Sequence, residues 1–174
     1  MADLELRFAR GSSVEGRQLS GVAAPFGVET RIADFREKIA PGAFTRTLSA
    51  GADVLALADH DTTKVLGRTS TGTLQLREGA DGLHYSLTLP DTSTGNDLRA
   101  LAARGDLGGV SFGFNVVRDS WDGDLRTLHD VELHEISIVQ AWPAYPTTSV
   151  SLRHRQSVEH DPLAVRRYWL ETCR

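Results

Sequence analysis

The chain has 174 residues, of which 40% are hydrophobic and 24% are charged, and this predicts one globular domain with a hydrophobic core. Its formal net charge of −4 gives no reason to expect nucleic acid or an anionic membrane as a partner, and no apolar run approaches the length of a membrane span. A single cysteine, Cys173, excludes an intramolecular disulfide and a cysteine zinc cluster, and the charged N-terminus does not resemble a signal peptide, so we expect a cytosolic protein.

The N-terminal half of the chain is predicted to consist mostly of short strands. Residues 4–8 alternate between apolar and charged side chains, which is the pattern of a half-buried strand. A polar turn is expected at 11–16, a loop from Gly27 and a short helix at 43–50. Further strands are expected at residues 18–25, 35–39, 54–58, 65–68, 74–77 and 83–89, with a hairpin turn at 79–82.

A longer helix is predicted in the middle of the chain. Pro90 ends the strand pattern, and Ser93 or Thr94 can cap a helix that runs to about residue 104. Gly105 follows at the position where glycine commonly ends a helix. The face expected to be buried carries Leu98, Leu101 and Ala102.

The pattern after this helix returns to strands, at residues 110–117, 127–133, 136–139 and 149–152, with a turn at 120–125. About ten short strands and one clear helix predict a mainly β fold with flanking helices, arranged as a closed or nearly closed β-barrel. Closure of the barrel would also remove the exposed sheet edges that so many short strands create.

The last residues differ in composition from the rest of the chain. We expect the domain to span residues 1–153 and a C-terminal tail to span 154–174. Asp161 and Pro162 have the order of a helix start, a cap followed by a first-turn proline. The apolar residues of this predicted helix would pack on the domain or form a docking or dimerisation surface: Leu163, Trp169 and Leu170.

Three segments carry residues that can do chemistry. The first, at 59–61, directly follows an apolar run and contains His60, at the strand edge where a partly buried base would lie. Imidazole titrates near neutral pH, so it can accept and return a proton within one reaction cycle. The second segment, at 108–114, contains Ser111 among glycines and apolar residues. Small neighbours would let a substrate carbonyl approach this hydroxyl, which needs a base such as His60 to become a nucleophile.

The third segment, at 132–137, offers two groups that could orient the imidazole, Glu135 and the adjacent His134. Neighbouring residues of a strand point to opposite faces, so only one of the two can face Ser111. Alternation does not decide between them, because Leu133 would share the face of Glu135 and Ile136 would share the face of His134. From the residues alone, both remain open.

The order and spacing of these segments resembles the prohead proteases of tailed bacteriophages, which are related in fold to the herpesvirus assemblin proteases. The resemblance covers roughly residues 1–153. The stretches that carry it are GVAAPFG at 21–27, IAPGAF at 39–44, His60 with Asp61, VLGR at 65–68, GTLQL at 72–76, VSFGF at 110–114, LHEISIV at 133–139 and PAYP at 143–146. No single stretch is specific for this family, but the joint order and spacing of the stretches is specific for it.

This resemblance implies a serine endopeptidase with an assemblin-like closed β-barrel. The family's nucleophile falls on Ser111 and its base on His60, and the match to EIS at 135–137 favours Glu135 as the third member, with His134 as the alternative. Substrates would be the major capsid protein or a scaffolding protein, and the protease itself, cleaved inside the assembling procapsid in the host cytoplasm. A homodimer is possible, and no metal, cofactor, nucleic acid or membrane is expected to take part.

Two other functions fit the same residues. A catalytically inactive assembly factor that binds scaffold would show the same strand pattern without processing any substrate. An esterase-like hydrolase would use the same serine and histidine on a different acyl group. The backbone donors of an oxyanion hole are expected within 141–145 or around 109–112, and the sequence does not decide between these two segments.

Overall fold

The computed structural model describes residues 4–9 and 12–141, in which eleven strands and two helices form. The larger sheet has the order β1 (Glu5–Ala9), β10 (Gly109–Asp122), β11 (Leu125–Val139), β5 (Phe35–Ile39) and β4 (Thr30–Ile32). Two more strands join this sheet through β11, namely β6 (Leu55–Ala58) and its neighbour β7 (Asp61–Arg68). The smaller sheet has the order β2 (Ser12–Glu15), β3 (Gln18–Pro25), β9 (Gly82–Thr88) and β8 (Leu74–Glu78).

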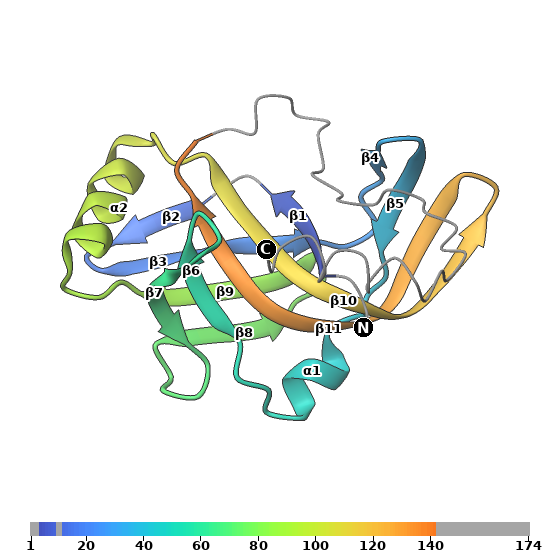
Figure 1. Ribbon diagram of the computed structural model, residues 1–174, viewed down its shortest axis with the longest axis horizontal. Helices are drawn as coiled ribbons and strands as arrows, with labels where there is room; N and C mark the ends of the chain where they lie inside the picture. The colour runs from blue at the N-terminus through green and yellow to red at the C-terminus, as the bar shows by residue number, and fades with distance from the viewer. Residues whose placement is uncertain (1–3, 10–11, 142–174) are drawn as a thin grey trace, which may run out of the picture.

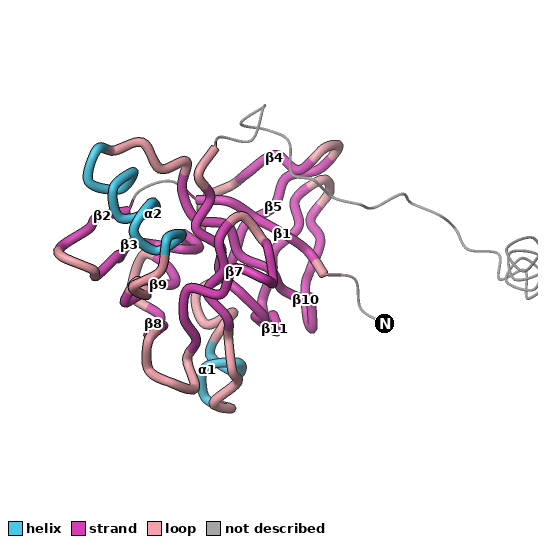
Figure 2. Tube along the Cα trace, turned by 60° about the vertical axis from the view of Figure 1, so that its left-hand side comes forward, coloured by secondary structure: helices cyan, strands magenta, loops and turns pink. Residues whose placement is uncertain are grey.

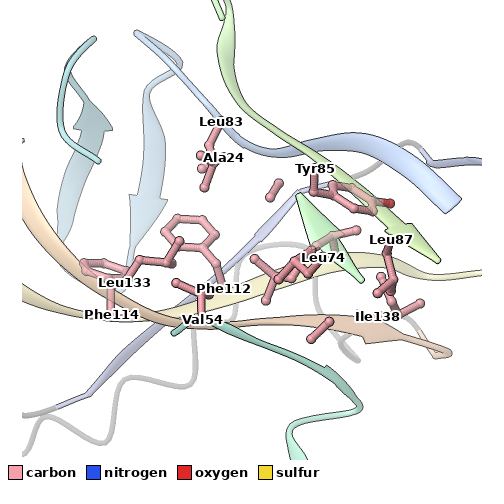
Figure 3. Close-up of a cluster of buried hydrophobic side chains, with 14 of the residues drawn as sticks. Ala24, Val54, Leu74, Leu83, Tyr85, Leu87, Phe112, Phe114, Leu133 and Ile138 are labelled. Atoms are coloured by element: carbon pink, nitrogen blue, oxygen red, sulfur yellow. The ribbon is translucent and has the colours of Figure 1, made fainter. Parts of the chain in front are cut away.

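The hydrophobic core forms where the two sheets face each other (Figure 3). Leu74, Leu83 and Leu87 of the smaller sheet enter it from one side and are at most 1% exposed. Phe112 and Phe114 of β10 enter it from the other side and stack with their ring centroids 5.2 Å apart. Each large apolar side chain buried in this way contributes roughly 1.5–3 kcal/mol to stability.

Both helices lie outside the strands (Figure 2). The shorter, α1 (Thr45–Ser49), lies against β11, and the longer, α2 (Ser93–Arg104), lies beside β2 at one end of the molecule (Figure 1). The N-cap of α2 is Thr92, whose side chain accepts a hydrogen bond from the Gly95 N–H at 3.2 Å. The prediction of Ser93 or Thr94 as the cap was therefore wrong by one or two residues, because the extended cap conformation occurs at Thr92.

The two longest strands, β10 and β11, form a curved hairpin that runs the length of the molecule, with its tip beside β4 and β5 (Figure 1). Both strands are longer than predicted, and Asp122 pairs with Leu125 across the turn. β11 pairs in parallel with β5 near its start and with β6 near its end. The second pairing brings the end of β6 beside the end of β11, where the functional residues lie.

The mainly β fold with flanking helices is confirmed. Among the described residues, strand pairing gives two sheets, and the closed barrel stays a prediction. The polar turn expected at 11–16 was wrong, because Ser12–Glu15 pairs with β3 as a strand, and a strand at Thr30–Ile32 lies in the segment expected to be a loop. Both strands are short and polar, so hydrophobic alternation gave little signal for them.

β1 is the predicted N-terminal strand, but its charged side faces inward. Arg7 lies opposite the core residue Phe112, and directly paired residues share a face of the sheet. Leu6 and Phe8 lie opposite Gly113 and Ser111 and therefore point to the other face. The alternation therefore predicted the strand correctly, but it did not predict that the charged face would be buried.

A buried ion cluster explains why these charges point inward. It consists of Glu5, Arg7, Glu37, Asp119 and Arg126, which come from four strands of the larger sheet. The Arg7 Nε lies 2.5 Å from the Glu37 Oε1, and the Arg126 Nη1 lies 2.9 Å from the Glu5 Oε2. Every buried charge of the cluster has an opposite partner, as burial requires.

The predicted strand at 149–152 and the predicted helical tail at 154–174 lie outside the described residues. Within the described residues, no helix is long and apolar enough to cross a membrane.

Candidate functional site

His60 lies in a tight turn between β6 and β7. Ala58 pairs with Asp61, so Asp59 and His60 alone form the loop of a β-hairpin. Their φ angles are 50° and 60°, both positive, as a type I′ turn requires. Asp and His are among the non-glycine residues that adopt this left-handed conformation most readily. The local sequence therefore suits a turn that projects the imidazole from the end of an apolar strand.

The turn is fixed to β11 by several hydrogen bonds. The Asp59 N–H donates to the Ile138 carbonyl at 3.0 Å. The Asp59 carboxylate accepts bonds from the main-chain and side-chain N–H groups of Gln140, at 2.9 and 2.6 Å. The His60 N–H donates to the Ser137 Oγ at 3.2 Å. Beside the turn, hydrogen bonds from Thr63 hold the pKa of Asp61 below its ordinary value.

The side chain of Glu135 holds the imidazole of His60. Its Oε1 lies 2.5 Å from the His60 Nδ1, and its Oε2 accepts a hydrogen bond from the Ser137 Oγ at 2.7 Å. The Glu135 side chain is 9% exposed and that of His60 is 29% exposed. The Nε2 of His60 has no hydrogen-bond partner among the described residues, so it is the nitrogen available to accept a proton.

Ser111 lies on the neighbouring strand β10 and on the same face of the sheet. It pairs directly with Ser137 of β11, and side chains paired in this way have Cβ atoms about 4.5–5.5 Å apart. Ser111 is 5% exposed, and its hydroxyl donates to the Arg7 carbonyl of β1 at 2.6 Å. The structure therefore brings the predicted nucleophile to the sheet face that carries the His60–Glu135 pair.

Gly113 leaves the space that the Glu135 carboxylate occupies. The two residues pair directly, and a Cβ atom on Gly113 would lie 2.9 Å from both the Cγ and the Oε1 of Glu135. Gly113 lies within β10 and has no positive φ, so its backbone conformation does not require glycine. Its lack of a side chain thus serves the carboxylate, a role that the sequence pattern did not suggest.

A β-bulge places Glu135 rather than His134 beside His60. Glu135 pairs with Gly113 and Leu133 pairs with Phe114, which leaves His134 as an extra residue in β11. The bulge changes the alternation, so Leu133 and Ile136 both reach the core while Glu135 points to the opposite face. His134 has no side-chain hydrogen bond among the described residues.

A serine and a histidine are in direct contact at the far end of the hairpin. The Ser120 Oγ is 2.8 Å from the Nε2 of His129, but Ser120 is exposed and no carboxylate of the described residues bonds to His129. Of these two histidines, only His60 is hydrogen-bonded to a carboxylate. No cluster of three or more potential metal ligands occurs among residues 4–9 and 12–141.

Comparison with known proteins gives one match. A family model described as Caudovirus prohead serine protease matches residues 3–162, which is most of the chain. No curated protein and no solved structure matches the chain.

Proposed function

The chain belongs to the caudovirus prohead serine protease family, which makes it a serine peptidase of capsid maturation, and from this premise we propose which residues cleave the peptide bond and what they act on. Ser111 is the nucleophile, His60 is the general base and Glu135 orients the base. The observation that carries the proposal is the bond between the His60 Nδ1 and the Glu135 Oε1 on the same sheet face as Ser111. That bond leaves the Nε2 of His60 to take the serine proton.

The reaction begins with the Ser111 hydroxyl. In the substrate complex this hydroxyl exchanges its bond to the Arg7 carbonyl for one to the Nε2 of His60, since catalytic hydrogen bonds often become aligned only when substrate binds. The Ser111 Oγ then attacks the peptide carbonyl while His60 takes the proton. Glu135 holds the imidazole in its Nδ1–H form and stabilises the imidazolium as it forms.

The second half of the reaction returns the proton. His60 gives it to the leaving amine, the C–N bond breaks, and the acyl group remains on the Ser111 Oγ as an ester. His60 then deprotonates a water molecule, which attacks this ester and releases the second product. No metal or organic cofactor takes part in these steps.

The two segments considered for the oxyanion hole, 141–145 and 109–112, remain alternatives in this proposal. β10 lies between β1 and β11 over Val110–Phe114, so its N–H groups point toward the neighbouring strands. The chain after β11 passes close to the start of β10, because a Cβ atom on Gly108 would lie 2.7 Å from the Ala141 carbonyl oxygen. Residues 142–145 lie outside the described part of the chain.

The substrate is a major capsid protein or a scaffolding protein, and the protease also cuts itself. These reactions take place inside the assembling procapsid in the host cytoplasm. The assemblin-like closed barrel and a homodimer belong to the same proposal, and family membership is what supports them. The domain boundary at residue 153 is also part of the proposal, although the family model extends to residue 162.

The test is co-expression of the chain with the capsid and scaffolding proteins encoded beside it, read by the intact masses of all products. Wild type should shorten its substrate and itself, and Ser111→Ala should leave both uncut. Ser120→Ala is the matched control, because it removes another serine of β10, whose hydroxyl contacts His129 of β11 far from the proposed site. Cleavage by Ser111→Ala would refute the assignment of the nucleophile. An inactive assembly factor predicts no cleavage in any of the three, and an esterase predicts turnover of esters only.

A further inference from the structure

Ser137 occupies a central position in the site that the proposed mechanism does not use. It is fully buried, at 0% exposed, and lies directly opposite Ser111. Its hydroxyl donates to the Glu135 Oε2 at 2.7 Å and accepts from the His60 N–H at 3.2 Å. One hydroxyl group therefore links the side chain of the orienting acid to the main chain of the base.

These two hydrogen bonds fix the positions of both the Glu135 side chain and the His60 main chain. A serine hydroxyl has one donor hydrogen and can accept further bonds, so the two contacts are compatible with each other. The Glu135 carboxylate is then held at both oxygens, at Oε1 by His60 and at Oε2 by Ser137. Its rotation about the last side-chain bond would break both contacts at once.

Glu135 and Ser137 are close to each other because they lie two residues apart on β11. Residues two apart on a strand point to the same face, so Glu135 and Ser137 project side by side toward the turn. The main-chain N–H of His60 donates a hydrogen bond to the Ser137 hydroxyl, which connects the turn to β11, although β6 and β11 come from distant parts of the sequence.

We propose that Ser137 is a positioning residue, whose hydroxyl holds the Glu135 carboxylate and the His60 turn in the geometry that lets His60 act as a base. This inference rests on the catalytic roles proposed above. Ser137 does not touch the reacting atoms, so its loss should slow the chemical step and leave substrate binding unchanged. Misplacement of a catalytic group by about 1 Å can cost about 10²-fold in rate.

The test compares Ser137→Ala with Thr47→Val in the full chain, using the peptide around a mapped cleavage site as substrate. Thr47 is a matched control, because its buried hydroxyl also donates to one group and accepts from another on β11, at Val131 and Leu133. Both variants should lower the melting temperature. Only Ser137→Ala should lower kcat, by about 10-fold to 100-fold with KM unchanged.

Two further measurements separate positioning from stability. The Nδ1–H proton of His60, followed by NMR, should exchange faster with solvent in Ser137→Ala and should be unchanged in Thr47→Val. Ser137→Cys keeps the shape of the side chain with a somewhat larger atom and offers a weaker donor, so it should fold and still lose kcat if Ser137→Ala fails to fold.

Wild-type kcat and proton exchange in a folded Ser137→Ala or Ser137→Cys would overturn the inference. That result would leave the proposed function intact, provided that wild type cleaves the peptide and Ser111→Ala does not. If Ser111→Ala cleaves the peptide, the proposed function itself fails.

Discussion

Glu135 is the only acid of the described residues that bonds to the imidazole of His60, and it does so while nearly excluded from water. A buried carboxylate in this position favours one tautomer of the ring and compensates its charge during the reaction. The neutral amide of the same shape can do neither.

Glu135→Gln should therefore lower kcat by about 10³–10⁴, the scale of the effect when an aspartate in the equivalent role of a serine protease is replaced by its amide. His134→Asn, one residue away, should leave kcat within about twofold, because His134 lies on the bulge and its side chain has no hydrogen bond to His60 or Glu135. The measurement is the rate of cleavage of the same peptide by both variants. A large loss in His134→Asn and none in Glu135→Gln would reverse the assignment of the third residue.

Gly113 offers a second test at the scale of one residue. Gly113→Ala places a methyl group 2.9 Å from the Glu135 Oε1 and 3.1 Å from the Leu6 Cδ2, so either the carboxylate or the strand has to move. We expect a loss of roughly 1–3 kcal/mol in stability, the usual cost of overpacking, together with a large loss of kcat.

Gly123→Ala is the control for that experiment. Gly123 has a φ of 58° at the hairpin turn and no atom within 4 Å of its Cβ position, so alanine adds backbone strain far from the site. Gly123→Ala should lower the free energy of unfolding, measured by chemical denaturation, and should leave kcat for peptide cleavage unchanged. Full activity in Gly113→Ala would show that the carboxylate has room to move without consequence.

At the scale of elements, hydrophobic alternation predicted most strands, including the one that contains Ser111 and the one that precedes His60, and the resemblance to the protease family selected these two residues. It could not choose between Glu135 and His134, because the bulge at His134 shifts the alternation in the middle of β11. The sequence predicted two strands there, at 127–133 and 136–139, and the interruption between them was the only local sign of the bulge. The pairing of β6 with β11, which positions His60, joins segments about 80 residues apart and leaves no local pattern.

For β1, the sequence predicted the strand but not which of its faces would be buried. The alternation at 4–8 was correct, yet it could not predict that the charged side would be buried, because the partners of Glu5 and Arg7 lie on β5 and β11. Burial alone would lower the pKa of Arg126, but its bonds to Glu5 and Asp119 outweigh burial and raise it. The ion cluster thus joins the first strand to the long hairpin.

Arg126→Met should destabilise the fold by about 3–5 kcal/mol, because it leaves buried carboxylates without their partner. Arg36→Met is the matched control: Arg36 is exposed and bonds to Glu29 and Asp124, so its loss should cost about 1 kcal/mol or less. Urea denaturation of both variants measures the difference. Equal losses would mean that the ion cluster contributes no more than a surface ion pair.

At the scale of the whole molecule, the long hairpin gives the site its rigidity. Ser111, Gly113, Glu135 and Ser137 all lie on β10 and β11, whose other face packs in the core through Phe112, Phe114 and Ile136. His60 lies on a separate hairpin, formed by β6 and β7. Unfolding of the core would therefore separate the three proposed catalytic groups at once, and activity should be lost together with the fold.

Tyr85 connects the stability of the two-sheet core to pH. It lies in β9 with its ring in the core, 3% exposed, and its hydroxyl is 2.7 Å from the Ser12 Oγ of β2. Burial raises the pKa of this phenol to about 12, and the bond to Ser12 offsets part of the effect. In the unfolded chain the same group titrates near its ordinary value of about 10.

The stabilisation that this difference provides is fully present below about pH 10, where the phenol is protonated in both states. As the pH rises from about 10 toward 12, the unfolded chain loses the proton while the folded protein keeps it. The free energy of unfolding of wild type should then fall by up to about 1.4 kcal/mol per pH unit from this group. Tyr85→Phe cannot ionise, so denaturant melts in the same buffers should show a smaller decline, and parallel declines would mean that the phenol titrates normally in the fold.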